Sequence, residues 1–225
     1  MTSDLSKPTR VERRKARTRQ ALIEAGQRIL AERGTSDVSI QDITDEADVG
    51  FGSFYNHFST KSELFEEAVG DTLEAHGRML DQLTMGIDDP AEVFSTSVRL
   101  TAMLASTQPE IARVFVASGM SFLVSDRGLA PQALRDIERG IGSGRFTVHN
   151  PYVALAAAAG CLLSFLQISL DKPQILDGDA VDELAERLLR MFGMAPRSAR
   201  AVAHRPLPTV GLPIVPSAVT QHSRR

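Results

Sequence analysis

The chain has 225 residues, of which 43% are hydrophobic and 24% are charged, and its formal net charge is −3. This length suits one or two domains with a sizeable core, and the absence of Trp and the scarcity of Tyr favour helices over strands. The single cysteine, Cys161, excludes an internal disulfide, and the N-terminus lacks the apolar core of an export signal. These features predict a cytoplasmic, all-α protein.

Charge is distributed unevenly along the chain. Residues 1–61 carry ten Lys and Arg against nine Asp and Glu, residues 62–192 carry ten against nineteen, and residues 193–225 carry five against none. Six of the N-terminal cations lie between Arg10 and Arg19, where only Glu12 opposes them. Such a cluster can bind nucleic acid if its cations face one way, whereas the acidic middle of the chain would repel phosphate.

The first elements are predicted from helical spacing and capping residues. Residues 1–12 are predicted to form a disordered arm, followed by a helix over about 13–33 that Gly34 ends. Ser39 suits the N-cap of a second helix, and Asp42 adds an acid to its first turn, although a strict capping box would use Glu or Gln. Asp48 occupies the following turn, because Asp tolerates the left-handed conformation better than most residues.

The segment from Ser39 to Phe58 has the layout of a helix-turn-helix. A third helix over about 50–57 would turn Phe54 and Phe58 inward and leave Phe51 and Tyr55 outward. Two short helices joined by a tight turn, with polar and aromatic side chains on the second, are typical of a motif that enters the DNA major groove.

The rest of the chain reads as a helical body and a tail. Ser59 or Thr60 would cap a fourth helix, and further helices are expected at about 91–106, 109–123, 131–142, 151–170 and 179–192. The predicted domains are therefore 13–61, which contains the helix-turn-helix, and 62–192, a helical body. Residues 193–225, rich in Pro and Arg, are predicted to be a disordered tail.

The segment 151–170 contains no charged residue and is long enough to span a membrane. Its alanines lower the hydropathy, three polar residues interrupt it and no basic cluster anchors it. We therefore expect no membrane contact but a helix buried on most sides, with Cys161 inside it as a small packed hydrophobe, redox sensing being the alternative. Small residues would let it approach a second copy, and the amphipathic segment 179–192 would complete a four-helix homodimer interface.

The N-terminal third resembles the TetR family of bacterial transcriptional regulators. The residues that carry the resemblance are the Arg-rich start, Ala21 to Ala25, Gly34, Ser39 to Ile43, Ala47, Gly52 to Phe58 and Lys61 to Leu64. The resemblance implies a three-helix DNA-binding domain over 13–61, a variable ligand-binding and dimerisation domain over 62–192, and a homodimer built on the last two long helices. Such proteins usually repress transcription and release the operator when a small molecule binds.

Two features depart from the family pattern. The family commonly has Gly where this chain has Asp48, which suggests a slightly strained turn. It commonly has a small hydroxylated residue and then Lys where this chain has Gly50 and Phe51, which removes a usual DNA contact and changes the expected operator sequence.

The residues expected to contact a double-stranded operator combine cations, hydrogen-bonding groups and one apolar side chain. Tyr55 and His57 would bind phosphates by family analogy, Ser53 and Asn56 can bind bases or backbone, and Phe51 can pack on a thymine methyl. Gly52 would permit close approach to the sugar-phosphate backbone. The full predicted set is Arg17, Ser39, Gln41, Phe51, Gly52, Ser53, Tyr55, Asn56, His57 and Lys61.

The expected effector is a small hydrophobic molecule of unknown identity, because the body offers few polar anchors. Its predicted contacts are Phe94, Met103, Phe115, Phe122 and Phe165, although such side chains more often form a core. No cofactor or metal is expected, since the five histidines are dispersed and no phosphate-binding glycine loop occurs. Catalysis is not expected for the same reasons. The open alternative is a DNA-binding activator or architectural protein that needs no ligand.

Overall fold

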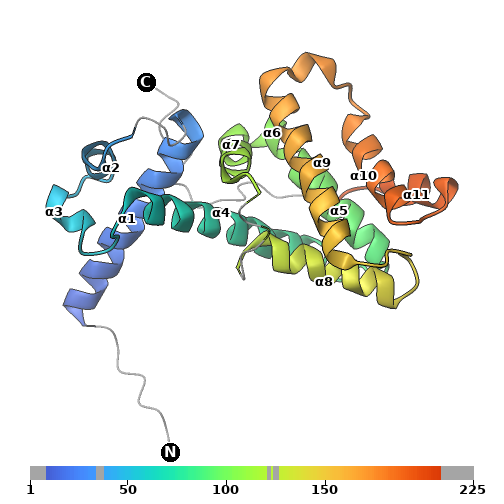
Figure 1. The fold of residues 1–225 in the computed structure, drawn as a ribbon, viewed down its shortest axis with the longest axis horizontal. Coiled ribbons are helices and arrows are strands. Elements are labelled where there is room, and N and C mark those ends of the chain that lie inside the picture. Colours follow the sequence, from blue (N-terminus) through green and yellow to red (C-terminus); the bar gives the residue numbers. More distant parts are fainter. Residues whose placement is uncertain (1–8, 34–37, 121–122, 124–126, 209–225) are drawn as a thin grey trace, which may run out of the picture. The chain divides into compact units, whose positions relative to one another are not determined.

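The computed structural model describes residues 9–33, 38–120, 123 and 127–208, and among them the regular elements are helices, with no strand. The predicted all-α fold is confirmed (Figure 1). The chain divides into two compact units, Met1–Ala68 and Val69–Arg225. Helix α4 (Lys61–Leu83) begins in the first unit and continues into the second.

The first unit contains α1 (Arg10–Arg33), α2 (Ile40–Glu46), α3 (Phe51–Phe54) and the start of α4. Helix α1 begins earlier than predicted. The prediction of a disordered arm over 1–12 is therefore wrong for residues 10–12, which are helical. Thr9 and Glu12 cap the helix reciprocally, because the amide of Glu12 donates to Thr9 Oγ1 at 3.2 Å and the amide of Thr9 donates to a Glu12 carboxylate oxygen at 2.6 Å. Residues 1–8 and Gly34 lie outside the described residues.

Helix α2 begins and ends as its sequence predicts. Ser39 caps it, and Asp42 forms a full capping box with Ser39, so the shorter carboxylate does what Glu or Gln usually does. Asp48, at φ 53°, makes the left-handed turn that leads to α3. Arg28 of α1 holds the end of α2, with Nε 2.5 Å from a Glu46 carboxylate oxygen and a second donor to the Glu46 carbonyl at 3.0 Å.

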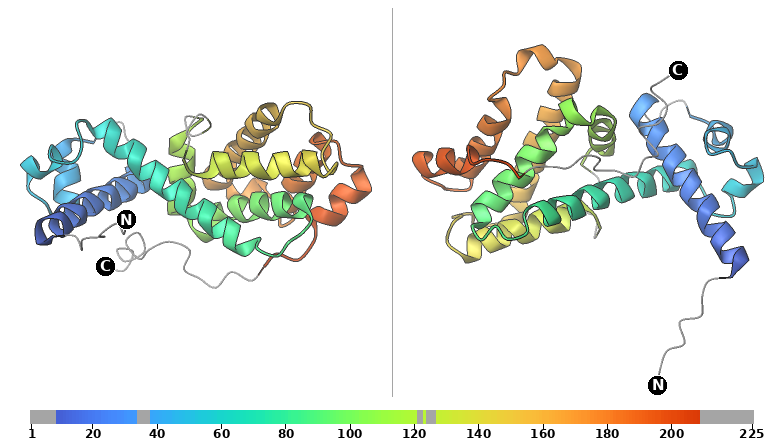
Figure 2. Two further views of the ribbon diagram at one scale, coloured as in Figure 1. Left: turned by 90° about the horizontal axis from the view of Figure 1, so that it is seen from below. Right: turned by 180° about the vertical axis from the view of Figure 1, so that it is seen from behind.

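The second unit packs its remaining helices around α5. They are α5 (Pro90–Ala102), α6 (Leu104–Thr107), α7 (Pro109–Ser118), α8 (Leu129–Gly142), α9 (Pro151–Asp171), a 3-10 turn at Pro173–Ile175, α10 (Ala180–Met191) and α11 (Pro196–Ala203). Helix α5 contacts α8, α9, α10 and α11 (Figure 2). The expected helix over 91–106 is interrupted at Met103, and the one over 109–123 ends at Gly119, which adopts φ 57°.

The prediction of a disordered tail is wrong for residues 193–208, which the structure describes and which include a helix. Helix α11 packs on α5 and α10, and its Ala199, Val202 and Ala203 are buried. The buried Arg99 of α5 donates to the carbonyl of Arg205 at 2.7 Å and forms an ion pair with Asp182 of α10 at 2.6 Å. Small apolar side chains at helical spacing therefore form a helix here despite the flanking prolines. Residues 209–225 lie outside the described residues.

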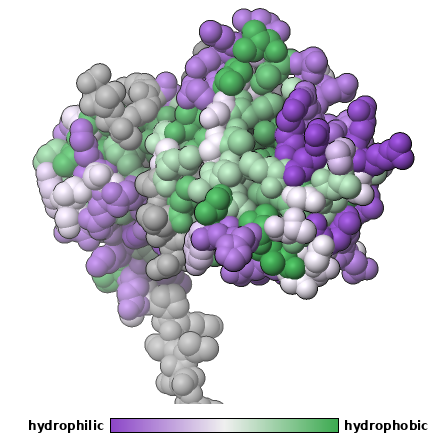
Figure 3. Space-filling model, turned by 45° about the vertical axis from the view of Figure 1, so that its right-hand side comes forward, coloured by the Kyte–Doolittle hydropathy of each residue, from purple (hydrophilic) through white to green (hydrophobic). Residues whose placement is uncertain are grey.

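Helix α9 is less buried within the chain than predicted. Among the described residues it is the one helix whose length and apolar composition would allow it to cross a membrane, and a core helix of a soluble protein meets the same criteria. Only 28% of its most apolar 18-residue window is buried, because other helices cover it from one side. Its other side exposes Tyr152, Val153, Ile168 and also Cys161, which corrects the expectation of a packed cysteine. Figure 3 shows a broad apolar area over α9.

Candidate functional site

The predicted recognition helix is shorter than expected. Its regular part is Phe51–Phe54, and Tyr55 to His57 continue as turns with i to i+3 hydrogen bonds, such as His57 N to Phe54 O at 2.9 Å. Gly50 offers no side-chain cap and Gly52 lowers helix propensity, which explains why the helix is short. Helix α3 lies directly after the α2 turn, so the two helices keep a helix-turn-helix order.

The aromatic side chains of this segment separate into two faces as predicted. Phe54 and Phe58 are buried in the first unit, whereas Phe51 is 48% exposed and Tyr55 is 55% exposed. The two outer rings meet edge to face at a centroid distance of 5.9 Å, and Tyr55 also meets the edge of Phe54 at 5.4 Å. The buried pair therefore anchors α3 while the outer pair presents an aromatic surface to solvent.

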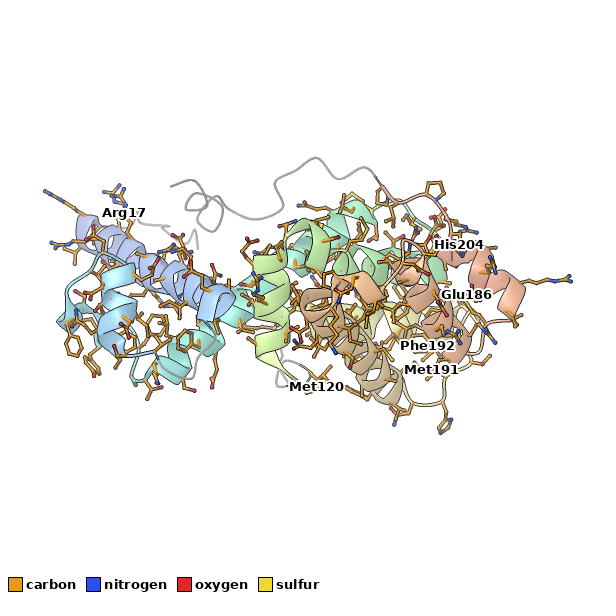
Figure 4. The ribbon with its side chains drawn as sticks, turned by 90° about the horizontal axis from the view of Figure 1, so that it is seen from above. Arg17, Met120, Glu186, Met191, Phe192 and His204 are labelled. Atoms are coloured by element: carbon orange, nitrogen blue, oxygen red, sulfur yellow. The ribbon has the colours of Figure 1, made fainter. Side chains whose placement is uncertain are left out.

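The cations near this surface differ in whether they contact the protein or project into solvent. Arg17 projects from α1 into solvent (Figure 4). Arg19 instead pairs with Glu67 at 3.0 Å and stacks over the Phe58 ring, so it serves the fold of the unit. Lys61 donates to the carbonyl of Val38 at 2.8 Å, which ties the start of α4 to the start of α2 and leaves two of its ammonium protons available.

Polar side chains complete the same surface. Asn56 is exposed and Ser53 and His57 are half-buried. Burial first, and the positive charges of Lys15 and Arg19 next, lower the pKa of His57, so its imidazole is neutral at pH 7 and can donate one hydrogen bond. The other two predicted contacts have local partners: Ser39 caps α2, and Gln41 donates to Asp45 at 2.6 Å.

Gly52 has open space where a side chain would stand. A Cβ atom built on it meets nothing within 4 Å, although the glycine lies in a helix. Packing inside the first unit therefore gives no reason for glycine at this position.

The second unit contains a cavity of about 70 Å³ that is partly open to solvent. Its walls come from α4, α5, α7, α8 and α9 and are mostly apolar, with Phe94, Val98, Phe115, Ile137, Leu155 and Ala158 among them. This volume is far below the several hundred Å³ of drug-sized pockets and suits a small molecule.

Five polar side chains of the cavity wall were not predicted from the sequence: Asp81 of α4, Ser97 and Thr101 of α5, and Gln132 and Asp136 of α8. Burial, the largest effect, and the nearby Asp81 raise the pKa of Asp136, while Arg135 and Arg139 oppose the shift. Gln132 donates to Asp81 at 3.0 Å, and its own carbonyl oxygen is buried without a hydrogen-bond partner in the structure. In the sequence, the i, i+4 spacing of Gln132 and Asp136, next to the apolar Ala133 and Ile137, was the signal that the two side chains share one face of a helix.

The predicted effector contacts divide between two places. Phe94 and Phe115 line the cavity. Met103 does not line it, and Phe165 lines a separate surface groove of about 180 Å³ near the end of α9. Phe122 lies outside the described residues. Spacing alone could not separate these positions, because aromatic residues at helical spacing fill cores and cavities alike.

Two family models match the chain. One, described as bacterial regulatory proteins of the tetR family, matches residues 22–68, and the other, described as a tetracyclin repressor-like C-terminal domain, matches residues 89–205. Together they cover the helix-turn-helix and most of the helical body.

Curated relatives match over part of the chain. The chain is 54% identical over 43 residues to the HTH-type transcriptional repressor DhaR of Mycobacterium sp. (strain GP1), which covers 19% of this chain and 22% of that protein. It is 36% identical over 87 residues to the probable acrEF/envCD operon repressor of Escherichia coli (strain K12), covering 38% and 39%. The chain thus spans well under half the length of these two relatives.

A solved structure matches over nearly its whole length. The chain is 34% identical to RolR in the structure of its complex with the ligand resorcinol, with a TM-score of 0.74. The match covers 88% of this chain and 99% of the RolR chain. RolR without ligand matches at 34% identity with a TM-score of 0.70.

Proposed function

Because the chain belongs to the TetR family of bacterial regulatory proteins, and is therefore a DNA-binding transcriptional regulator and not an enzyme, we propose that it is a homodimeric, cytoplasmic repressor. It binds a palindromic operator and leaves it when a small, largely apolar molecule occupies the cavity of the second unit. The observation that carries the DNA-binding part is the outward face of α3, where Phe51 and Tyr55 stay exposed while Phe54 and Phe58 hold the helix in place.

Affinity and specificity come from different residues of this face. Arg17 and Lys61 approach phosphates, and each phosphate neutralised contributes about −0.9 to the slope of log affinity against log salt. Tyr55 and the neutral His57 donate hydrogen bonds to the backbone, with Ser53 and Asn56 beside them. Ser39 and Gln41, whose side chains already have partners in α2, act mainly by holding the start of the motif.

Base recognition rests on Phe51 and Gly52. An exposed phenylalanine can pack on a thymine methyl in the major groove, and a glycine with open space above it lets the helix approach the sugar-phosphate backbone. Phe51 stands where the family pattern commonly has a lysine.

Dimerisation rests on the exposed side of α9. A soluble monomer rarely leaves a large continuous apolar face in water, and the alanines and Gly160 of α9 allow a second helix to come close. The predicted contribution of 179–192 is smaller, because α10 buries its own apolar stripe against α5 and α11 and exposes Glu183, Arg187 and Met191. We therefore place α9 at the centre of the interface and α10 at its edge. A short recognition helix on each subunit then reads one half-site, with half-sites roughly 34–36 Å apart.

The effector is a small molecule that fits the cavity between α4, α5, α7, α8 and α9. The cavity has mostly apolar walls, which include Phe94 and Phe115, and its small volume of about 70 Å³ favours a compact ligand. The bound resorcinol of RolR, a structure similar along nearly its full length, supports an effector of that size.

Footprinting on the DNA upstream of the gene tests the proposal. The purified full-length protein should protect a palindrome there and prefer it to bulk competitor DNA at moderate salt. Equal binding to both would contradict sequence-specific regulation. In a reporter strain, deletion of the gene should raise expression from the protected promoter; a fall in expression would favour activation.

A further inference from the structure

We propose that the cavity selects a neutral, single-ring molecule carrying two hydrogen-bond donors, such as a dihydroxylated benzene, and that Gln132 and Asp136 accept those two bonds. The inference rests on the effector part of the proposed function and adds the chemistry of recognition to it.

Asp81, which Arg135 holds in place, fixes the orientation of the Gln132 amide. Arg135 donates to one carboxylate oxygen of Asp81 at 2.7 Å, and Gln132 Nε2 donates to the other at 3.0 Å. A flipped amide would place two acceptor oxygens against each other, so Oε1 is held as the acceptor on the other side. This Oε1 atom is buried without a partner in the structure, which leaves an unmet acceptor at the cavity wall.

Gly77 of α4 makes room for this amide. A Cβ atom built on Gly77 would stand 1.6 Å from Gln132 Oε1, so any larger residue would displace the side chain. Glycine in a helix interior costs stability relative to alanine. Its presence here is explained by the space that the Gln132 amide requires.

Asp136 provides the second acceptor. It lies one helical turn after Gln132 on α8, so both side chains project from one face and line the same cavity. Its nearest cations, Arg135 and Arg139, are 3.9 and 3.8 Å from the same oxygen, Oδ1, too long for a strong hydrogen bond. A hydroxyl that donates to this buried carboxylate replaces the water lost on burial.

The other lining groups agree with a donor-bearing ligand. Thr101 already donates to the Ser97 carbonyl at 2.8 Å and lies 2.8 Å from His76 Nε2, so its hydroxyl is used. The Ser97 hydroxyl can turn to donate or accept and does not oppose such a ligand. Among the described residues that line the cavity there are two carboxylates and no Lys or Arg, which disfavours a ligand with a carboxylate or phosphate.

Ligands of similar size test separately whether the cavity requires hydroxyl donors and whether it requires a neutral molecule. Calorimetric titration of the full-length protein should use 1,3-dihydroxybenzene, phenol, 1,3-dimethylbenzene and benzoate. We expect affinity to fall about tenfold for each hydroxyl lost and benzoate to bind most weakly. If the dimethyl compound binds as tightly as the dihydroxy compound, or if benzoate binds best, the selection of donors is refuted while an apolar effector stands.

Substitutions identify the acceptor. Gln132→Met keeps the length of the side chain and removes the acceptor, and Gly77→Ala displaces the amide. Each substitution should weaken the binding of 1,3-dihydroxybenzene by about tenfold. Gln132→Met should leave the binding of 1,3-dimethylbenzene unchanged. Gln82→Met, on the exposed side of α4, is the matched control and should change neither.

Two outcomes oppose the inference in different ways. Unchanged binding of 1,3-dihydroxybenzene by Gln132→Met would remove Gln132 from recognition. If none of the four compounds binds although the protein still selects its operator, the ring-sized effector fails together with this inference, and the DNA-binding part of the proposed function stands.

Discussion

His76 of α4 lies with Nε2 2.8 Å from the hydroxyl of Thr101 on α5, and this hydroxyl donates to the Ser97 carbonyl at 2.8 Å. Since the Thr101 proton is used on Ser97, His76 must donate from Nε2, and its Nδ1 is a bare acceptor that is buried without a partner in the structure. The ring also meets Phe115 edge to face at 5.1 Å. A neutral histidine of α4 therefore contacts two side chains of the cavity wall.

This arrangement predicts a loss of stability in mild acid. Burial lowers the pKa of His76 to about 4, whereas the unfolded chain takes up the proton near 6.5. As pH falls from 6.5 to about 4, the unfolded state binds a proton that the folded state excludes, so the free energy of unfolding falls by about 3 kcal/mol from this group. His76→Gln can still donate to Thr101 and does not titrate.

Urea unfolding of both proteins between pH 7 and 4 measures the effect. The wild type should lose more stability than His76→Gln over this range, and His149→Gln, at an exposed site, should follow the wild type. Parallel curves for wild type and His76→Gln would contradict a buried neutral histidine.

Gly52→Ala should separate folding from DNA binding. The new methyl group meets nothing within 4 Å inside the protein and should stabilise the helix by roughly 0.5–1 kcal/mol. If α3 approaches the sugar-phosphate backbone here, the same methyl group should weaken operator binding at least about tenfold. Thermal unfolding and fluorescence anisotropy measure the two effects; unchanged operator affinity would show that the glycine is not needed for close approach.

Phe51→Ala should reduce affinity for the operator more than affinity for random DNA. An apolar contact with a thymine methyl contributes to one sequence only, and its loss should cost on the order of 1–3 kcal/mol of discrimination. Because the ring is half exposed, the fold should tolerate the change. Tyr55→Phe is the contrasting variant, since loss of a phosphate contact should weaken both DNAs alike. An equal loss on both DNAs for Phe51→Ala would remove it from base recognition.

Val153→Arg tests the α9 interface. Val153 is 64% exposed in the single chain, so the arginine can reach solvent in a monomer but would bury an unpaired charge in a dimer. Analytical ultracentrifugation should show a shift toward monomer, with weaker operator binding because two half-sites are no longer bound together. Met85→Arg, at an exposed position between α4 and α5, should remain dimeric. A wild type that is monomeric at micromolar concentration would contradict the interface itself.

Truncation should distinguish residues 194–208 from those that follow. Ending the chain after Gly193 removes α11 and the carbonyl of Arg205, which exposes the apolar face of α10 and leaves the buried Arg99 without one acceptor. We expect a loss of roughly 3 kcal/mol or more in the free energy of unfolding. A chain ending after Pro208 retains these contacts and should unfold like the full-length protein. Equal stability of the two truncated forms would show that α11 does not support the body.

Local sequence signals determined most of the first unit. The Ser39 cap, the left-handed turn at Asp48 and the inward Phe54 and Phe58 each depend on residues that are neighbours in the chain, and the structure confirms all three. The length of α3 was overestimated, because the end of a four-residue helix depends on competing i to i+3 bonds that spacing does not reveal.

The sequence by itself thus determined the helical class, the helix-turn-helix and its outward aromatic pair, since capping, turn formation and helical periodicity act over a few residues. Only the tertiary structure decided that α11 is ordered, that α9 keeps one apolar side uncovered, and that Asp81, Gln132 and Asp136 share a cavity with Phe94 and Phe115. These features depend on contacts between helices far apart in the chain. The periodicity of one helix shows which side is apolar but not which partner covers it.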